Sequence, residues 1–149
     1  MRRVLLALVV VSTVGLLVEL LLLEHYESPW QWTPLVLLGV VLAVAAIVAI
    51  HATPTNIRVF QGCMVLCIIA GILGLWLHYR GNVEFELERD SSLHGLALFW
   101  EALRGATPSL APGAMTQLGL LGLAFAHHHP ALRSQPPVRH SADAFTQET

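Results

Sequence analysis

A carboxylic acid stands inside the first apolar run of the chain. Glu19 lies between Val18 and Leu20, and the run closes at Glu24 and His25. An ionisable side chain is costly in hydrocarbon, so within a membrane segment it marks a candidate functional site. Such a carboxyl group either handles protons, ions or small solutes, or is a protonated or paired group that fixes helix packing.

Helical spacing gives Glu19 its expected neighbours. Ser12, Gly15, Glu19 and Tyr26 follow one another at intervals of 3, 4 and 7 residues, which places them on one helix face. Gln117, in the last apolar run, offers a hydrogen-bond partner from another helix. We therefore assign Glu19, Tyr26 and Gln117 to one buried polar group with an ion-handling or structural role.

A divalent transition-metal site is a second hypothesis. His25 and His78 supply imidazoles and Glu24 or Glu19 a carboxylate, a ligand set that suits zinc, manganese or iron. At 100° per residue, Glu24 and His25 lie about 140° and 240° from Glu19. In a regular helix Glu24 and His25 therefore point away from Glu19. All three can serve one site only if the helix breaks near Leu23. Alternatively, the two histidines are anchors at the membrane interface.

Haem b is a weaker hypothesis for the same histidines. Haem iron takes axial imidazole ligands, and His25 and His78 form one such pair. His51 with His127 or His128 forms another at the opposite membrane face. All of these residues lie at helix ends, whereas haem needs a buried apolar surround.

Composition indicates an integral membrane protein. The 149 residues are 55% hydrophobic and 12% charged, with a mean hydropathy of +0.64. A soluble domain carries about 25% charged residues, and several apolar runs here approach the roughly 20 residues that span a bilayer. The formal net charge of -2 and the lack of a basic stripe argue against a nucleic-acid partner.

The fold class that follows is an all-α four-helix transmembrane bundle. It occupies residues 1–129, and residues 130–149 form a disordered cytoplasmic tail rich in polar residues. Proline, glycine and polar clusters divide the chain. The predicted spanning helices cover residues 4–23, 34–50, 59–79 and 108–126.

The long segment between the last two spans has two expected parts. Residues 82–89 alternate apolar and charged side chains, which predicts an extended strand-like segment. Residues 93–104 carry an apolar stripe that includes Leu96 and Trp100, with a cap at residues 90–92 and an end at Gly105. This pattern predicts an amphipathic helix that lies on the outer membrane surface or packs back on the bundle.

Stripes of small residues predict close helix contacts. One stripe on the third span leads to His78, and a second runs along the last span. The first consists of Cys63, Cys67, Gly71 and Gly74, and the second of Pro112, Gly119, Gly122 and Ala126.

The distribution of arginine predicts the topology. Five arginines fall on the side of the two termini, and three fall in the long segment. The positive-inside rule then places both termini in the cytoplasm, for a multi-pass protein of a bacterial inner membrane. Five arginines are thus cytoplasmic (Arg2, Arg3, Arg58, Arg133 and Arg139) and three are external (Arg80, Arg89 and Arg104).

The expected function is non-enzymatic, because no catalytic motif is present. The sequence favours an accessory or assembly subunit, or an ion- or small-solute-handling protein, with a polar cluster at the outer membrane face. Its expected partners are the lipid bilayer and other membrane subunits or a second copy of the chain. The alternative is a metal- or haem-binding redox protein that uses His25 and His78.

Overall fold

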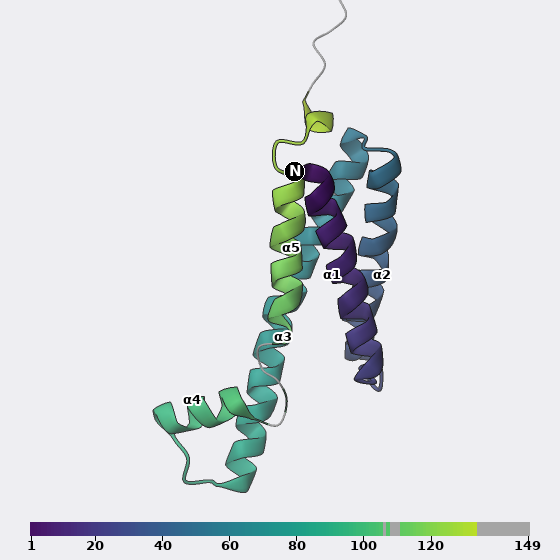
Figure 1. Cartoon of the computed structure of the whole chain (residues 1–149). Coiled ribbons are helices and arrows are strands. Elements are labelled where there is room, and N and C mark those ends of the chain that lie inside the picture. The colour runs from purple at the N-terminus through teal and green to yellow at the C-terminus, as the bar shows by residue number, and fades with distance from the viewer. Residues whose placement is uncertain (106, 108–110, 134–149) are drawn as a thin grey trace, which may run out of the picture.

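The computed structural model describes residues 1–105, 107 and 111–133. These residues form helices and contain no strand (Figure 1). The helices are α1 (Arg2–Leu22), α2 (Pro29–Ile50), α3 (Pro54–Arg89), α4 (Gly95–Arg104), α5 (Gly113–Ala126) and the short 3-10 helix η1 (Pro130–Leu132).

Three of these helices, α1, α2 and α3, are long and apolar enough to cross a membrane. The fourth predicted span is shorter than expected, because α5 has 14 residues. At 1.5 Å per residue it is about 21 Å long, against about 30 Å for the hydrocarbon core. Of the predicted range 108–126, residues 108–110 lie outside the described part of the chain.

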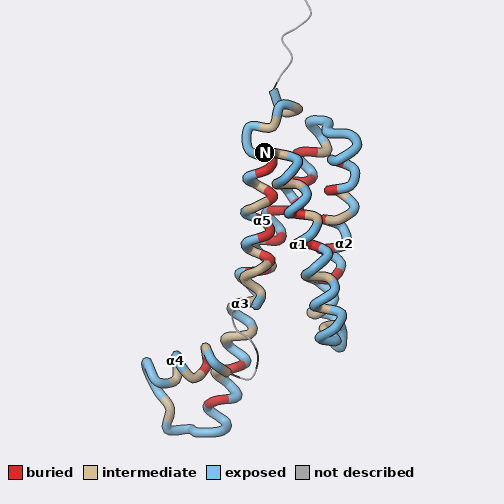
Figure 2. Tube along the Cα trace, viewed as in Figure 1, coloured by how far each residue is buried: buried red, intermediate tan, exposed pale blue. Residues whose placement is uncertain are grey.

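The three long helices and α5 share one core. The α5 helix packs along α3, α3 packs on α2, and α1 contacts both α2 and α5. Figure 2 shows the buried residues on the faces that these helices turn toward one another. The largest fully buried side chains include Phe60, Leu38, Ile57 and Met64.

Small residues bring α3 and α5 close together, as the two stripes predicted. A Cβ atom added to Gly74 would lie 2.7 Å from the Cβ of Pro112, and one added to Gly71 would overlap Thr116. On α5, Gly119 faces the backbone of α3 in the same way. Any larger side chain at these positions would force the helices apart.

Two helices begin five residues earlier than predicted. The α2 helix starts at Pro29 instead of residue 34, and α3 at Pro54 instead of residue 59. Proline fits the first helical position because no N–H group is lost there, and the Thr53 hydroxyl accepts a 3.2 Å hydrogen bond from the Asn56 N–H. The Ser-Pro and Thr-Pro pairs therefore begin helices instead of interrupting the chain.

The prediction of an extended segment at residues 82–89 is wrong, because α3 continues as one helix to Arg89. Charged pairs at helical spacing support this extension: Arg80 with Glu84 at 3.0 Å, and Arg89 with the buried Glu86 at 2.6 Å. A lone strand leaves its backbone groups without a ladder partner. A helix satisfies them internally, so it prevails over the period-two pattern.

The predicted amphipathic helix is α4. It begins two residues later than predicted and ends before Gly105 as expected. The predicted cap at residues 90–92 is instead a turn. In that turn, the Asp90 carboxylate accepts hydrogen bonds from the Ser92 N–H and hydroxyl at 2.9 and 2.7 Å. His94 is the N-cap residue, and Gly95 has a φ of +58°. That left-handed conformation favours glycine.

Asn82 fastens α4 to the extension of α3. Its side-chain N–H groups donate to the carbonyl oxygens of Ala102 and Thr107 at 2.9 and 2.7 Å. Its carbonyl oxygen accepts from the Thr107 N–H and hydroxyl at 3.1 and 2.7 Å. Asn82 is buried, so α4 is held by a hydrogen-bonded connection in addition to apolar contact.

Arg2 joins the start of α1 to the end of α5. Its guanidinium donates to the carbonyl oxygens of Phe125, His127 and His128 at 2.7, 2.9 and 2.9 Å. These carbonyl groups lie at a helix C-terminus, where no intrahelical donor remains for them. The chain then forms η1 within the range assigned to the tail, while residues 134–149 lie outside the described part.

Protonation of His129 is expected to loosen η1 at acidic pH. Burial and the charge of Arg2 lower the pKa of His129, and its Nδ1 accepts a 3.2 Å hydrogen bond from the Ala131 N–H. Because the pKa of His129 is lower in the folded state, the neutral ring stabilises that state at pH values above the unfolded-state pKa of about 6.5. This stabilisation is lost as pH falls through the folded-state pKa. After correction for its intrinsic pH dependence, hydrogen exchange of residues 126–132 should therefore accelerate as pH falls from 7.5 to 5.

Two variants test this prediction. His129→Gln removes the titrating group, so the exchange rate, corrected for its intrinsic pH dependence, should no longer change with pH. Arg2→Ala removes the neighbouring charge and should shift the transition to higher pH. An unchanged pH response in His129→Gln would assign the transition to another group.

Candidate functional site

A pocket with polar and apolar lining residues lies between α1 and α5. It has a volume of about 320 Å³, and both helices contribute to its wall. Glu19 and Gln117 both line this pocket. Both are exposed, however, and no hydrogen bond joins them in the described part of the chain, so the structure does not show the predicted buried polar group. The lining residues are Ser12, Gly15, Leu16, Glu19, Ala114, Gln117, Leu118 and Leu121.

The α1 wall of this pocket is open because its small residues are not packed against a neighbour. A Cβ atom added to Gly15 would meet nothing within 4 Å, unlike the glycines between α3 and α5. Ser12 lies about 15 Å along α1 from Arg2, and Glu19 lies about 5 Å from the end of the helix at Leu22. The pocket therefore extends from the middle of α1 toward the α1–α2 turn.

Tyr26, the third member of the predicted polar group, is not among the residues that line the pocket. The α1 helix ends at Leu22, so helical phase no longer places Tyr26 above Glu19. Its ring instead packs beside Trp32 in α2, with 6.4 Å between ring centroids. The predicted helix over residues 4–23 already ended before Tyr26, so the placement of Tyr26 beside Glu19 required a helix that continues past that range.

The break near Leu23 that a combined metal site would require does occur. The Glu24 N–H donates to the Leu21 carbonyl at 3.1 Å, and the His25 N–H to the Leu20 carbonyl at 2.9 Å. Glu24 has a φ of 52°. This is a Schellman motif, in which a left-handed residue ends the helix. Glycine usually occupies that position, and Glu24 concealed the motif in the sequence.

Two of the predicted metal ligands come together. The rings of His25 and His78 are 6.3 Å apart between centroids, and the buried Nδ1 of His78 has no hydrogen-bond partner among the described residues. Glu24 is exposed, and the described residues contain no group of three side chains suited to one metal ion. Two imidazoles are one fewer than the three protein ligands of ordinary catalytic zinc sites.

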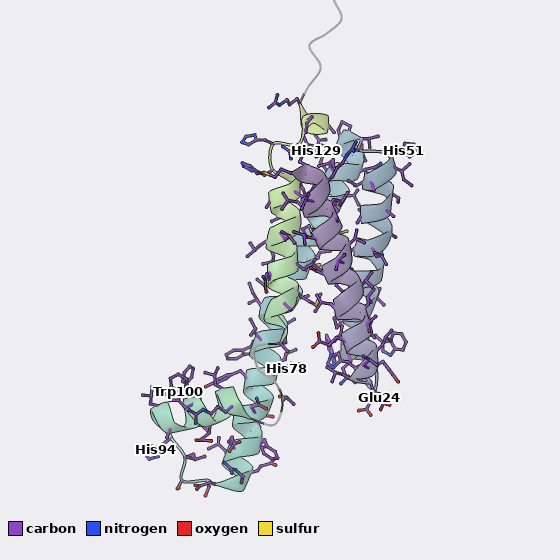
Figure 3. The ribbon with its side chains drawn as sticks, in the orientation of Figure 1. Glu24, His51, His78, His94, Trp100 and His129 are labelled. Carbon is purple, nitrogen blue, oxygen red and sulfur yellow. The ribbon has the colours of Figure 1, made fainter. Side chains whose placement is uncertain are left out.

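The histidines considered for haem lie at the two ends of the molecule. Figure 3 shows His51 and His129 at one end and His78 at the other. The rings of His127 and His128 stack on each other at 4.1 Å between centroids. No histidine lines the α1–α5 pocket.

Known proteins do not assign a role to this site. Comparison of the chain with protein-family models, with characterised proteins and with solved structures finds no match. The features that bear on function are therefore the chemistry of the α1–α5 pocket and the lengths of α1 and α2.

Proposed function

We propose that the chain is a multi-pass integral membrane protein in which α1, α2, α3 and α5 form a four-helix bundle within the bilayer. The lengths of α1 and α2, 21 and 22 residues, match the roughly 20 residues that cross the hydrocarbon core. The circuit of contacts from α1 through α2, α3 and α5 back to α1 supports a single bundle.

Both termini are proposed to face the cytoplasm of a bacterial cell. The N-terminus and η1 lie at the same end of the molecule, and α4 lies at the other (Figure 1). Arg2, Arg58 and Arg133 belong to the first end, where positive charge favours the cytoplasmic side. The outer end then carries the α1–α2 turn and α4.

The proposed function is the binding and handling of a small cation, the proton included, in the α1–α5 pocket. The observation that carries this proposal is that Ser12, Glu19 and Gln117 line one pocket between two apolar helices. Their hydroxyl, carboxylate and carboxamide groups all offer oxygen acceptors. Glu19 and Gln117 are exposed at the protein surface, which would face hydrocarbon in the proposed bilayer, and a carboxylate attracts a cation more strongly where water is scarce. The pocket volume of about 320 Å³ is at the lower end of the range for small-molecule sites.

Replacement of Glu19 tests this proposal. In proteoliposomes with an imposed membrane potential, a pH-sensitive dye should report proton flux for the native chain, and methylammonium uptake should report organic cation flux. Glu19→Gln keeps the side-chain volume but removes the charge, so it should reduce whichever flux is present at least about tenfold, or 1.4 kcal/mol. Glu19→Ala should do the same.

Glu27→Gln is the matched control, because Glu27 is an exposed acid in the α1–α2 turn and is not part of the pocket wall. It should retain the native flux. If Glu19→Gln and Glu19→Ala both fold and conduct like the native chain, Glu19 has no role in ion handling. Absence of both fluxes from the native chain would also contradict the proposal.

A further inference from the structure

The α4 helix has an apolar face that the described residues leave largely open. Leu96, Phe99 and Trp100 retain 74%, 42% and 51% of their surface exposed, while Ala102 is buried against α3. At 100° per residue, the three exposed side chains fall within an arc of about 100°. The polar residues Glu101 and Arg104 lie outside this arc.

The level of α4 along α3 follows from the hydrogen bonds and ring contacts that hold it. The apolar run of α3 ends before His78, and about 20 residues before that point suffice to cross the bilayer. The Tyr79 ring contacts the Phe99 ring at 5.9 Å between centroids. Asn82, which bonds Ala102, lies only about 6 Å beyond His78. The α4 helix is therefore held just past the expected hydrocarbon boundary.

The α1–α2 turn marks the same level independently. The ring of His25 in this turn lies 6.3 Å from that of His78. Beside it are Tyr26 and the exposed Trp32, and tyrosine and tryptophan prefer the headgroup region of a bilayer. His78 and Trp100 are at the same end of the molecule (Figure 3), and α4 runs across the axis of α3 (Figure 1).

We propose that Leu96, Phe99 and Trp100 rest in the headgroup layer of the phospholipid bilayer that the bundle spans. This inference depends on the membrane insertion proposed above. A helix parallel to the surface places its apolar side chains at the acyl boundary and its charged side chains in water. Asn82 sets the depth and direction of α4, so binding to lipid requires no reorganisation of this helix.

Nitroxide labels on the full-length chain test the inference. The native Cys63 and Cys67 are replaced by alanine, and single cysteines are introduced at Leu96, Trp100 or Arg104. The protein is reconstituted in vesicles of phosphatidylethanolamine and phosphatidylglycerol. Labels at Leu96 and Trp100 should be several-fold more accessible to oxygen than to a water-soluble nickel chelate. The label at Arg104 should show the reverse preference.

A label at Val40 of α2, which is 46% exposed, separates this inference from the proposal of membrane insertion. If Val40 is in lipid but Leu96 and Trp100 meet the nickel chelate as Arg104 does, α4 stands in water and the inference is overturned. Protection of both α4 labels from both reagents would indicate a protein partner and would also overturn it. If Val40 meets the chelate, membrane insertion itself fails.

Discussion

Replacing Gly119 with alanine is expected to lower the free energy of unfolding by about 1–3 kcal/mol, the usual range for overpacking. The added Cβ would lie 2.5 Å from the Met64 carbonyl oxygen and 3.1 Å from the Ile68 backbone nitrogen. Both atoms belong to the backbone of α3, which a rotamer change cannot move. The α3 and α5 helices would therefore have to separate, and the contact that supports the pocket wall would weaken. Unfolding in mixed micelles at increasing dodecyl sulfate measures the effect.

Gly62→Ala is the matched control on α3. A Cβ atom at Gly62 would meet nothing within 4 Å, and alanine is the better helix former by up to about 1 kcal/mol. This variant should therefore unfold at the native dodecyl sulfate concentration or slightly above it. Equal unfolding midpoints for Gly119→Ala and Gly62→Ala would contradict the close approach of α3 and α5.

Replacing Asn82 with alanine is expected to release α4 from α3. The change removes all four hydrogen bonds to Ala102 and Thr107, and a typical intramolecular hydrogen bond contributes about 0.5–1.5 kcal/mol. Gly105 shows how tightly the amide fits, because a Cβ atom there would lie 2.6 Å from the Asn82 Cγ. Hydrogen exchange of residues 95–104 should accelerate strongly, while exchange of α1 and α2 should stay near the native rate.

Arg80→Ala is the comparison for this second experiment. Arg80 lies on the same extension of α3, and its pair with Glu84 is exposed on both sides. Such surface pairs contribute about 0–1 kcal/mol, so α4 should keep its native protection. If Asn82→Ala also keeps it, apolar contacts alone hold α4, and the hydrogen bonds of Asn82 are not required.

Periodic patterns in the sequence predicted the parts of the fold that depend on burial. Apolar runs located the three long helices, and the spacing of glycines predicted the close packing of α3 and α5. Helical phase also placed Ser12 and Glu19 on one face, and the pocket contains both, with Gln117 opposite. These predictions work because each needs only regular geometry within one helix.

Features that depend on tertiary contacts or on local backbone geometry escaped prediction. Nothing in the sequence links Arg2 to carbonyl groups more than 120 residues away. The period-two pattern of residues 82–89 concealed a helix, because the burial of Asn82 and Glu86 is not visible in one dimension. Glu24 adopts the left-handed conformation that is usual for glycine and ends the helix there, so the predicted position of Tyr26 was wrong.

The continuity of α3 has a mechanical consequence. Its 36 residues form one helix, which is about 54 Å long and carries α4 at one end and the contact with α5 along its middle. The part beyond His78 acts as a lever arm of about 17 Å. If α4 rests on the bilayer as proposed, a change in lateral pressure or curvature that tilts α4 would therefore pivot the whole of α3 against α5, whose first turns form one wall of the pocket.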